Sequence, residues 1–261
     1  MNCLFAYCTD RGTRRDCNQD SLLFRQMVCR GERAALAVLC DGMGGLQMGE
    51  EASASLVRAF AGWSEQELPA LLPELSAGRT PEESWNRLLL EENERLGDLG
   101  RSFGVQTGTT VTALLFCRGM YYAVHVGDCR AYEITRRIRP LTKDQTLAGR
   151  EVEEGRLTRR EAAYDRRSHV LLQCVGASGG IRPAYTQGRI PKDAVYLLCC
   201  DGFWHTVRER EMYRALQPHA VKEERLMEKR LRDMAVLGRK RGGQDDITAL
   251  AVRPPGGYEN A

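Results

Sequence analysis

Four aspartates, spread over the whole chain, each stand where a strand-like run meets a turn. They are Asp20 in RRDCNQD, Asp41 in VLCDGMGG, Asp201 in LLCCDGFW and Asp245 in GGQDDITALAV. Hard cations such as Mg²⁺ and Mn²⁺ take carboxylate oxygens, and strand ends can aim several carboxylates at one point. No single helix could supply ligands so far apart in sequence. We therefore predict a metal cluster that folding assembles.

Two of these aspartates are followed by glycine, in Asp41-Gly42 and Asp201-Gly202. A glycine at the end of a buried strand lets backbone carbonyls approach a ligand closely. Asp-Gly also makes ordinary turns, and turn chemistry alone explains most such pairs. Taken singly, each pair leaves both interpretations open.

The histidines and cysteines indicate no separate site. The four histidines are His125, His169, His205 and His219. They lack HxxH-type spacing, which disfavours zinc, and we expect all four to be structural. Cys40, Cys129 and Cys200 adjoin aspartates of interest. Alternation along a strand predicts that Cys40 and Cys200 face the core, where a thiol without a cationic neighbour is unreactive.

The composition excludes several classes of protein. The 261 residues carry 38 Lys plus Arg against 35 Asp plus Glu, a near balance that gives no reason to expect nucleic-acid binding. The ten cysteines have no regular spacing and no signal peptide precedes them, so we expect a reduced, cytoplasmic protein. No apolar stretch approaches the roughly 20 residues that span a bilayer, so we expect no membrane insertion.

The first third of the chain reads as strands followed by helices. Apolar runs predict the strands, and acids at a helix start together with Pro81 predict the helices. The expected strands are 3–9, 20–29 and 33–40, and the expected helices are 50–60, 65–75 and 81–96.

The rest of the chain returns to strands, with one interruption. Strands are expected at 109–117, 120–127 and 129–135, joined by tight turns at Arg118-Gly119 and Gly127-Asp128, then near Val170 and Ala184 and at 194–200 and 247–252. Helices are expected at 208–216 and 221–237, and 142–167 is charged and helix-like in two short pieces.

Strand groups flanked by helix pairs indicate an α+β fold in which two antiparallel sheets pack together with helices outside. A site built from Asp20 and Asp245 needs both ends of the chain, so we expect one domain over 1–253. Residues 254–261, PPGGYENA, have the composition of a disordered tail.

Seven ordered motifs resemble the type 2C family of metal-dependent protein Ser/Thr phosphatases, and in particular its bacterial members. The resemblance covers Met1 to Val252, and seven motifs in order make chance very improbable although each alone is weak. The motifs are TDRGTRRDCNQDS, VLCDGMGG with GEEAS, TGTTVTALLF, VHVGDCRAY, LTKDQT, CDGFW and GGQDDIT.

The resemblance implies a centre of two ions, Mn²⁺ or Mg²⁺. Asp41 is implied to bridge them, with the Gly42 carbonyl bound to one. Asp201 and Asp245 are implied to hold the second ion, and Asp20 to act mostly through metal-bound water. A metal pair suits phosphomonoester hydrolysis because it neutralises phosphoryl charge and activates a water molecule.

Two further residues receive roles from the resemblance. Arg15 matches the arginine that grips the substrate phosphate, a task suited to the guanidinium fork. The alternative for Arg15, and for its neighbour Arg14, is an unpaired surface arginine, and the spacing favours Arg15 for the phosphate. Asp128 matches the residue that holds a third, weakly bound ion together with Asp201. The alternative is that Asp128 only makes a hairpin turn with Gly127.

The chain departs from the family pattern at four positions. Met43 and Leu46 stand where members commonly carry a histidine thought to protonate the leaving oxygen, which leaves the general acid unassigned. Cys129 replaces a serine. Asp246 replaces an asparagine and adds negative charge beside the metals.

By resemblance, the protein hydrolyses phosphoserine and phosphothreonine in proteins with metal-activated water and without a phosphoenzyme. Its expected partners are phosphoproteins, a bacterial Ser/Thr kinase and that kinase's targets, and it is expected to be a monomer. The segment 147–169 matches a mobile flap that contacts the protein part of the substrate, with a plain loop cover as the alternative. The rival function is a catalytically weak module that binds phosphoproteins.

Overall fold

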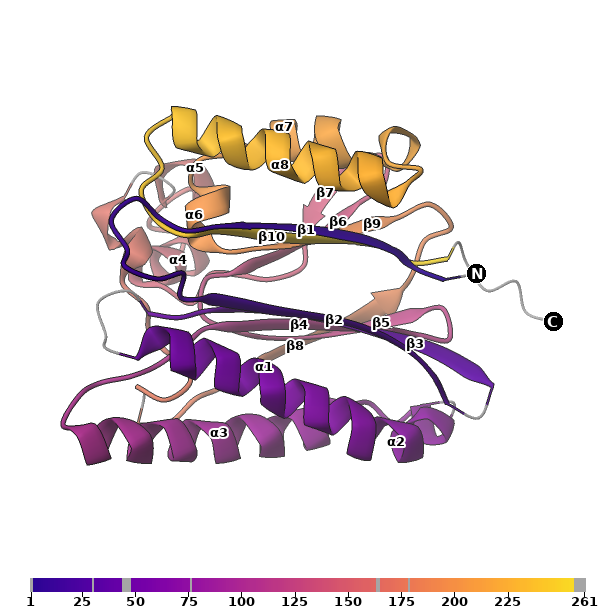
Figure 1. Cartoon of the computed structure of the whole chain (residues 1–261), viewed down its shortest axis with the longest axis horizontal. Helices are drawn as coiled ribbons and strands as arrows, with labels where there is room; N and C mark the ends of the chain where they lie inside the picture. Colours follow the sequence, from indigo (N-terminus) through magenta and orange to yellow (C-terminus); the bar gives the residue numbers. More distant parts are fainter. Residues whose placement is uncertain are drawn as a thin grey trace.

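The computed structural model of the chain describes residues 2–29, 31–43, 48–75, 77–162, 165–177 and 179–255. They form four layers, with two β-sheets in the middle and helices on both outer faces (Figure 1). This α-β-β-α arrangement confirms the predicted fold class.

The first sheet joins the two ends of the chain. Its strands, in spatial order, are β1 (Leu4–Asp10), β10 (Ile247–Arg253), β9 (Val195–Cys199), β6 (Arg130–Ile134) and β7 (Ile138–Pro140). All neighbours are antiparallel, and the β1–β10 register runs from Leu4 opposite Arg253 to Asp10 opposite Ile247. This pairing carries the segment around Asp245 to the segment around Asp20.

The second sheet is also antiparallel. Its strands, in spatial order, are β2 (Asp20–Cys29), β3 (Glu32–Asp41), β4 (Val111–Cys117), β5 (Met120–Val126) and β8 (Ala184–Arg189). Asp20 pairs directly with Asp41, so two of the predicted ligands meet at one end of this sheet. Arg118 and Gly119 both have positive φ, 51° and 74°, and make the predicted tight turn between β4 and β5.

Helices cover the outer face of each sheet. Those on the second sheet are α1 (Gly49–Gln66), α2 (Leu68–Leu75) and α3 (Glu82–Phe103), and those on the first are α7 (Glu209–Leu216) and α8 (Glu224–Lys240) (Figure 1). Burial on both faces explains the continuous apolar run of β3. Leu36 and Val38 pack toward the helices, whereas Ala37 and Leu39 face the other sheet.

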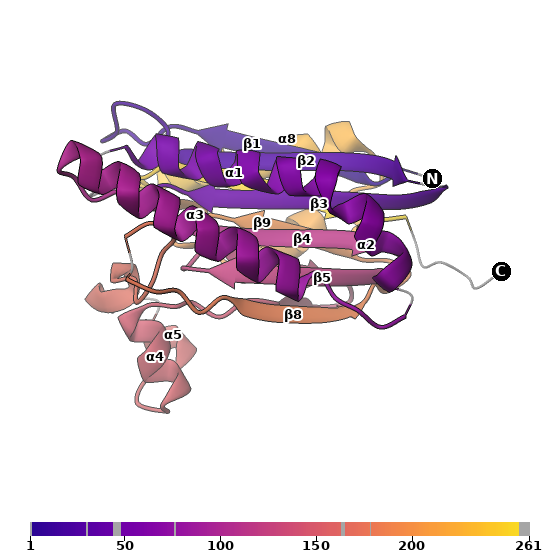
Figure 2. The same ribbon diagram turned by 90° about the horizontal axis from the view of Figure 1, so that it is seen from below.

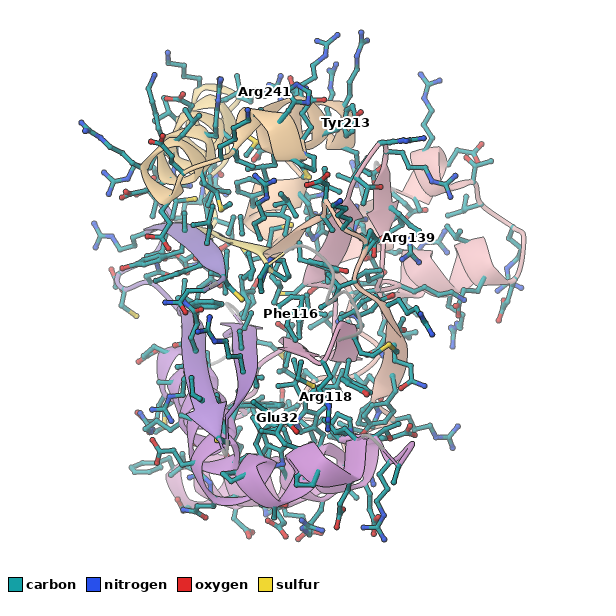
Figure 3. The ribbon with its side chains drawn as sticks, turned by 90° about the vertical axis from the view of Figure 1, so that its right-hand side faces the viewer. Glu32, Phe116, Arg118, Arg139, Tyr213 and Arg241 are labelled. Carbon is teal, nitrogen blue, oxygen red and sulfur yellow. The ribbon has the colours of Figure 1, made fainter. Side chains whose placement is uncertain are left out.

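Aromatic rings fill the space between the sheets. Phe116 of β4 lies in this middle layer (Figure 3), with its ring centroid 4.9 Å from that of Tyr196 in β9. Tyr121 of β5 packs 5.5 Å from the same ring. These contacts hold the two sheets face to face and fix how their ends meet.

The charged insertion forms a separate helical lobe. It contains α4 (Leu147–Glu153), α5 (Arg159–Ala162) and the 3₁₀ helix η1 (Arg166–His169), and α4 and α5 lie apart from the layers (Figure 2). Thr146 caps α4, since its hydroxyl accepts a hydrogen bond from the Gly149 amide at 3.0 Å. We call residues 147–169 the flap. Short helices also follow β9, at α6 (Asp201–Trp204), and α7, at η2 (Pro218–Ala220).

One predicted strand is absent from the structure, and one observed strand was not predicted. The strand expected near Val170 is the end of η1, and only an isolated bridge joins Leu171 to Thr146. Strand β7 was missed because three residues beside the basic run RRIR carry too little apolar pattern to detect.

The prediction of a hairpin turn at Gly127-Asp128 was also wrong. Strand β5 belongs to the second sheet and β6 to the first, so these two residues carry the chain from one sheet to the other. Gly127 has φ 111°, and a Cβ there would lie 2.6 Å from the Thr110 side chain. The glycine therefore allows a close crossing, which leaves Asp128 between the two sheets.

Candidate metal centre

Five aspartates converge at one end of the sandwich. Asp20 and Asp41 come from paired positions of β2 and β3, and ligand atoms of both lie within 4.8 Å of each other and of the Cys200 sulfur. Burial is the first cause that raises the pKa of Asp41 well above its usual range, and repulsion from neighbouring carboxylates is the second. Those neighbours are Asp20, Asp201, Asp128 and Asp245.

The carboxylate of Asp20 indicates whether this group of aspartates suits metal cations. Both of its oxygens are buried, and neither accepts a hydrogen bond of normal geometry from the described residues. Burial is the largest cause that raises the pKa of Asp20 to about 7; contacts with Thr248 and Cys200 act to lower it, and the charge of Asp246 adds to the rise. Buried carboxylates without partners are costly, and divalent cations at this point would neutralise them. The residues present fit the implied metal pair.

Gly42 is held tightly beside Asp41. Its amide donates to the Gln19 carbonyl at 3.0 Å, and an isolated bridge pairs Gly42 with Thr109. Any side chain at Gly42 would collide with the Gly49 carbonyl at the start of α1. Only glycine therefore allows the turn after β3 to pack against this helix.

Arg15 lies at the same site and is paired with Asp245. Its Nη2 and Nε atoms donate to one Asp245 oxygen at 2.6 and 3.0 Å, and Nη1 donates to Gln19 at 3.2 Å. The Arg15 side chain is 22% exposed, whereas Arg14 is an exposed residue. Arg15, and not its neighbour, is therefore in contact with the aspartates of this centre.

The carboxylate of Asp246 accepts hydrogen bonds from backbone amides. One of its oxygens accepts from the Gly12 amide at 2.7 Å and the other from the Gln19 amide at 2.9 Å. The residue is buried, and its charge still contributes to the raised pKa of Asp20. The added negative charge expected from the sequence is present, but both oxygens are engaged in positioning the loop that carries Arg15.

Asp128 is buried beside Asp201. Burial and then repulsion from Asp201 raise the pKa of Asp128 well above its usual range. Its backbone carbonyl accepts from the Trp204 indole at 3.0 Å, and the Arg130 guanidinium stacks 3.5 Å from the centre of that ring. These contacts fix the backbone of Asp128 and keep its carboxylate close enough to Asp201 for the two charges to repel each other.

Both Cys40 and Cys200 lie in the hydrophobic core, as predicted, but Cys200 also borders the carboxylates, which the alternation did not predict. Cys40 packs in the core under α1 to α3. The Cys200 sulfur is also fully buried, yet it lies beside the Asp20 and Asp41 carboxylates and accepts from the Thr248 amide at 3.1 Å. Burial raises the pKa of the Cys200 thiol well above its usual range, which keeps it protonated and unreactive.

Met43 and Leu46 occupy the positions where family members commonly carry a histidine. Met43 is half-buried, and its amide donates to the Gly108 carbonyl at 3.0 Å. Leu46 lies outside the described residues.

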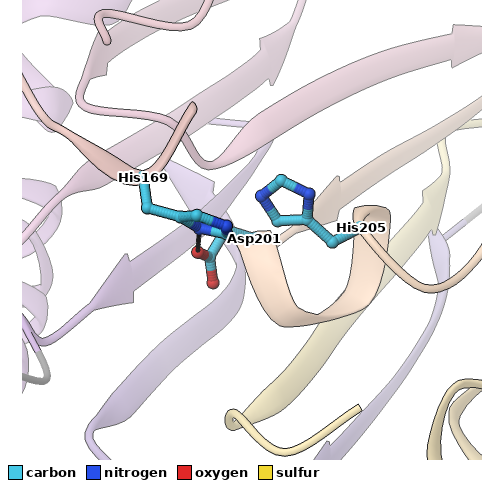
Figure 4. Close-up of side chains that lie close together, drawn as sticks. All are labelled: His169, Asp201 and His205. Carbon is cyan, nitrogen blue, oxygen red and sulfur yellow. Dashed lines mark ion pairs between the residues drawn. The ribbon is translucent and has the colours of Figure 1, made fainter. Parts of the chain in front are cut away.

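Histidines reach the centre from elsewhere in the chain. His125 is structural, as expected, between the Thr112 hydroxyl at 2.9 Å and the Lys143 carbonyl at 3.1 Å. His169 and His205 instead flank Asp201 (Figure 4), and His169 Nδ1 lies 3.6 Å from Asp201 Oδ2. Burial acts to raise the pKa of Asp201, but the His169 contact and positive charge from the imidazoles outweigh it and lower that pKa. No spacing in the sequence indicates this cluster, because the flap must fold back to bring His169 to α6.

The chain is similar in sequence to bacterial serine/threonine phosphatases. The chain is 33% identical over 255 residues to the serine/threonine protein phosphatase PstP of Mycobacterium tuberculosis. The aligned region covers 95% of this chain and 44% of the relative. The chain therefore spans less than half the length of this relative. It is 26% identical to the serine/threonine phosphatase Stp of Listeria monocytogenes, over 94% of this chain and 93% of that one.

Solved structures agree with these relatives. The Streptococcus agalactiae serine/threonine phosphatase superposes with a TM-score of 0.80 at 26% identity, over 96% of this chain and 98% of that one. The PstP catalytic domain in complex with two manganese ions superposes with a TM-score of 0.76 at 25% identity, over 97% of this chain and 99% of that one. No family model matches the chain. Among the described residues, no helix combines the length and apolar composition that crossing a bilayer requires.

Proposed function

This chain belongs to the type 2C family of metal-dependent protein Ser/Thr phosphatases, in its bacterial branch, and from that premise we propose that it hydrolyses phosphoserine and phosphothreonine in proteins. The observation that carries the proposal is the convergence of five aspartates at one end of the sandwich, where both Asp20 oxygens are buried without a hydrogen bond of normal geometry from the described residues. A module that only bound phosphate would gain nothing from buried negative charge, which repels the ligand.

The carboxylates would hold the cations that the reaction uses. Asp41, the Gly42 carbonyl, Asp201 and Asp245 are the proposed ligands of two ions, Mn²⁺ or Mg²⁺, with Asp20 beside them. When bound, such a pair neutralises charge on the phosphoryl oxygens and lowers the pKa of a water molecule. The burial of the Asp20 oxygens lowers the local dielectric constant, which strengthens electrostatic interactions at that point.

Arg15 is proposed to bind and orient the phosphate. Its guanidinium is already fixed by Asp245 and Gln19 and is partly exposed, so little side-chain freedom is lost when substrate binds. Two parallel N–H donors suit the geometry of a phosphate.

A cavity between the flap and the core is proposed to receive the protein part of the substrate. It has a volume of about 840 Å³ and is lined by residues of both parts, among them Val152 and Arg160 of the flap and Trp204 and His205 of the core. His205 belongs to the cluster around Asp201, so the cavity adjoins the metal centre.

The test of the proposed function is hydrolysis of a phosphothreonine peptide by the folded protein with added Mn²⁺. Phosphate release that a chelator abolishes would support the enzyme. Folded protein that binds the peptide without any Mn²⁺-dependent turnover would support the binding module instead.

The setting of the reaction is also a proposal. We propose a cytoplasmic monomer that acts on the substrates of a bacterial Ser/Thr kinase. The support is that similar bacterial proteins carry the name of serine/threonine phosphatases.

Arg15→Ala is expected to raise KM for a phosphopeptide more than it lowers kcat, because phosphate contacts made equally before and during reaction act on binding. Arg14→Ala is the matched control, since this residue is exposed. Steady-state kinetics with saturating Mn²⁺ measures both constants. A larger effect at Arg14 would move the phosphate clamp by one residue.

Asp128→Ala is expected to lower turnover at limiting Mn²⁺ while leaving two tightly bound ions, because Asp128 is proposed to hold a third, weaker ion with Asp201. Metal analysis after dialysis counts the tight ions, and a Mn²⁺ titration of activity reports the weak one. Unchanged activity at every Mn²⁺ concentration would restrict Asp128 to a structural role.

Arg160→Ala in the flap is expected to lower kcat/KM for phosphopeptides several-fold, while hydrolysis of p-nitrophenyl phosphate changes little. The reason is that Arg160 lines the cavity proposed for the protein part of the substrate, and the small ester has no such part. The comparison of the two substrates with one enzyme preparation is the measurement. Equal losses on both would mean that the flap shapes the metal centre itself.

A further inference from the structure

One cluster beside the metal centre is not explained by the proposed reaction. Side chains of His169 from η1, Asp201 from the start of α6 and His205 from its end point toward one another (Figure 4). One ligand atom from each residue lies within 4.8 Å of the other two. The two imidazole rings are 4.4 Å apart between centroids.

The imidazole of His205 is held in place and lacks a partner. Its ring packs 3.7 Å from the Trp204 ring, which Arg130 covers on another side. Its Nε2 atom is buried and has no hydrogen-bond partner among the described residues. A buried ring nitrogen without a donor or acceptor is costly, and coordination of a metal is one way to satisfy it.

We propose that His169, Asp201 and His205 form a binding site for a cation that prefers imidazole, with Zn²⁺ as its representative. Two imidazoles and one carboxylate are a common zinc ligand set that leaves a fourth position open. Tetrahedral bonds of about 2.0–2.1 Å place ligand atoms roughly 3.4 Å apart. The His169 Nδ1–Asp201 Oδ2 separation is already 3.6 Å, and no pair in the cluster is more than 4.8 Å apart. The remaining contraction can come from rotation of the exposed His169 side chain.

The site differs from the implied Mn²⁺ or Mg²⁺ pair in chemistry and in consequence. Mg²⁺ prefers oxygen ligands, whereas imidazole nitrogen favours zinc and its neighbours in the transition series. Asp201 is shared, so zinc would compete for a carboxylate of the centre. Because His169 belongs to the flap and His205 to the core, the same ion would tie the flap down over the cavity.

The experiment titrates Zn²⁺ into the 261-residue chain, stripped of transition metals and held in excess Mg²⁺, with isothermal titration calorimetry as the readout. Mg²⁺ is present to occupy oxygen sites. We expect His169→Gln and His205→Gln each to weaken zinc binding by at least 10- to 100-fold. His219→Gln, in η2 and outside the cluster, is the matched control and should bind zinc like the wild type.

A second readout reports the link between flap and core. Hydrogen exchange of residues 166–169 should slow when Zn²⁺ binds to the wild type and should not change in His205→Gln. If His205→Gln fails to fold, the exposed His169→Gln still tests the proposal. Equal zinc affinity in the wild type and His169→Gln would overturn it and leave His169 and Asp201 as an ion pair only. Neither readout depends on hydrolysis, so the proposed function and this site can fail separately.

Discussion

Asp41→Asn is expected to abolish nearly all Mn²⁺-dependent hydrolysis and, at the same time, to stabilise the metal-free protein. The amide keeps the shape of the carboxylate but loses the charge that binds a hard cation. We expect kcat to fall by at least the roughly 10²- to 10³-fold that removal of a single electrostatic stabiliser costs. The combination of opposite effects on activity and stability separates a ligand from a residue that merely supports the fold.

The gain in stability follows from the repulsion in the unneutralised centre. Burial and four neighbouring carboxylates raise the pKa of Asp41 well above its usual range, so its charged form destabilises the folded state. Its removal at neutral pH should raise the free energy of unfolding in chelator, because the amide carries no charge that folding must bury or protonate. Mn²⁺ should then stabilise the variant less than the wild type.

Urea unfolding with and without Mn²⁺ is the measurement. Asp98→Asn is a suitable control, because Asp98 lies on the exposed surface of α3 in an ion pair with Arg101. That exposed pair should contribute little to stability. A metal-free Asp41→Asn protein that is less stable than the wild type would show that Asp41 is a structural residue with satisfied contacts.

The aspartates of the candidate site were predictable from the sequence because each adjoins an apolar strand. Asp41 and Asp201 lie where such a strand ends, and Asp20 and Asp245 lie where one begins. The structure brings Asp41, after the buried run of β3, and Asp201, after that of β9, to one point. The sequence could not predict how strands divide between the sheets. Gly127-Asp128 resembles a hairpin turn locally, and only the pairing of β6 with β9 shows that the chain changes sheet there.

The histidine cluster was not predictable for a related reason. Metal motifs are recognised in a sequence when their ligands share one helix or loop, so that spacing is fixed. His169 and Asp201 are separated by the end of the flap and two strands. Their contact depends on how the flap packs, and the irregular segment near Val170 carries no periodic pattern that would predict that packing.

The pH dependence of stability in the metal-free protein is a second test of the centre. Burial raises the pKa of Asp20 from its usual value near 3.8 to about 7. A carboxyl group with a raised pKa in the folded state stabilises the fold at a pH below about 4, and this contribution is lost as pH rises toward 7. Each pKa unit corresponds to about 1.4 kcal/mol, so the full effect is on the order of 4 kcal/mol.

Other groups oppose this trend in part of the same range. Burial lowers the pKa of His125 and of His205 to about 4, and such groups stabilise the fold as pH rises from about 4 to 6.5. The free energy of unfolding of the wild type, plotted against pH, therefore combines contributions that rise and contributions that fall. The difference between Asp20→Asn and the wild type removes the histidines, because both proteins share them.

We expect this difference in the free energy of unfolding to be near zero at pH 4 and to favour Asp20→Asn increasingly up to about pH 7. Urea unfolding in chelator at each pH unit provides the curve. Saturating Mn²⁺ should remove most of the pH dependence above pH 6, because the cation takes the place of the proton on the carboxylates. A difference that is flat with pH would mean that Asp20 ionises normally, and the buried centre would then have no need of a cation at Asp20. The low stability of the metal-free protein near neutral pH and its affinity for metal thus have one common cause, which is the repulsion among carboxylates that folding brings together.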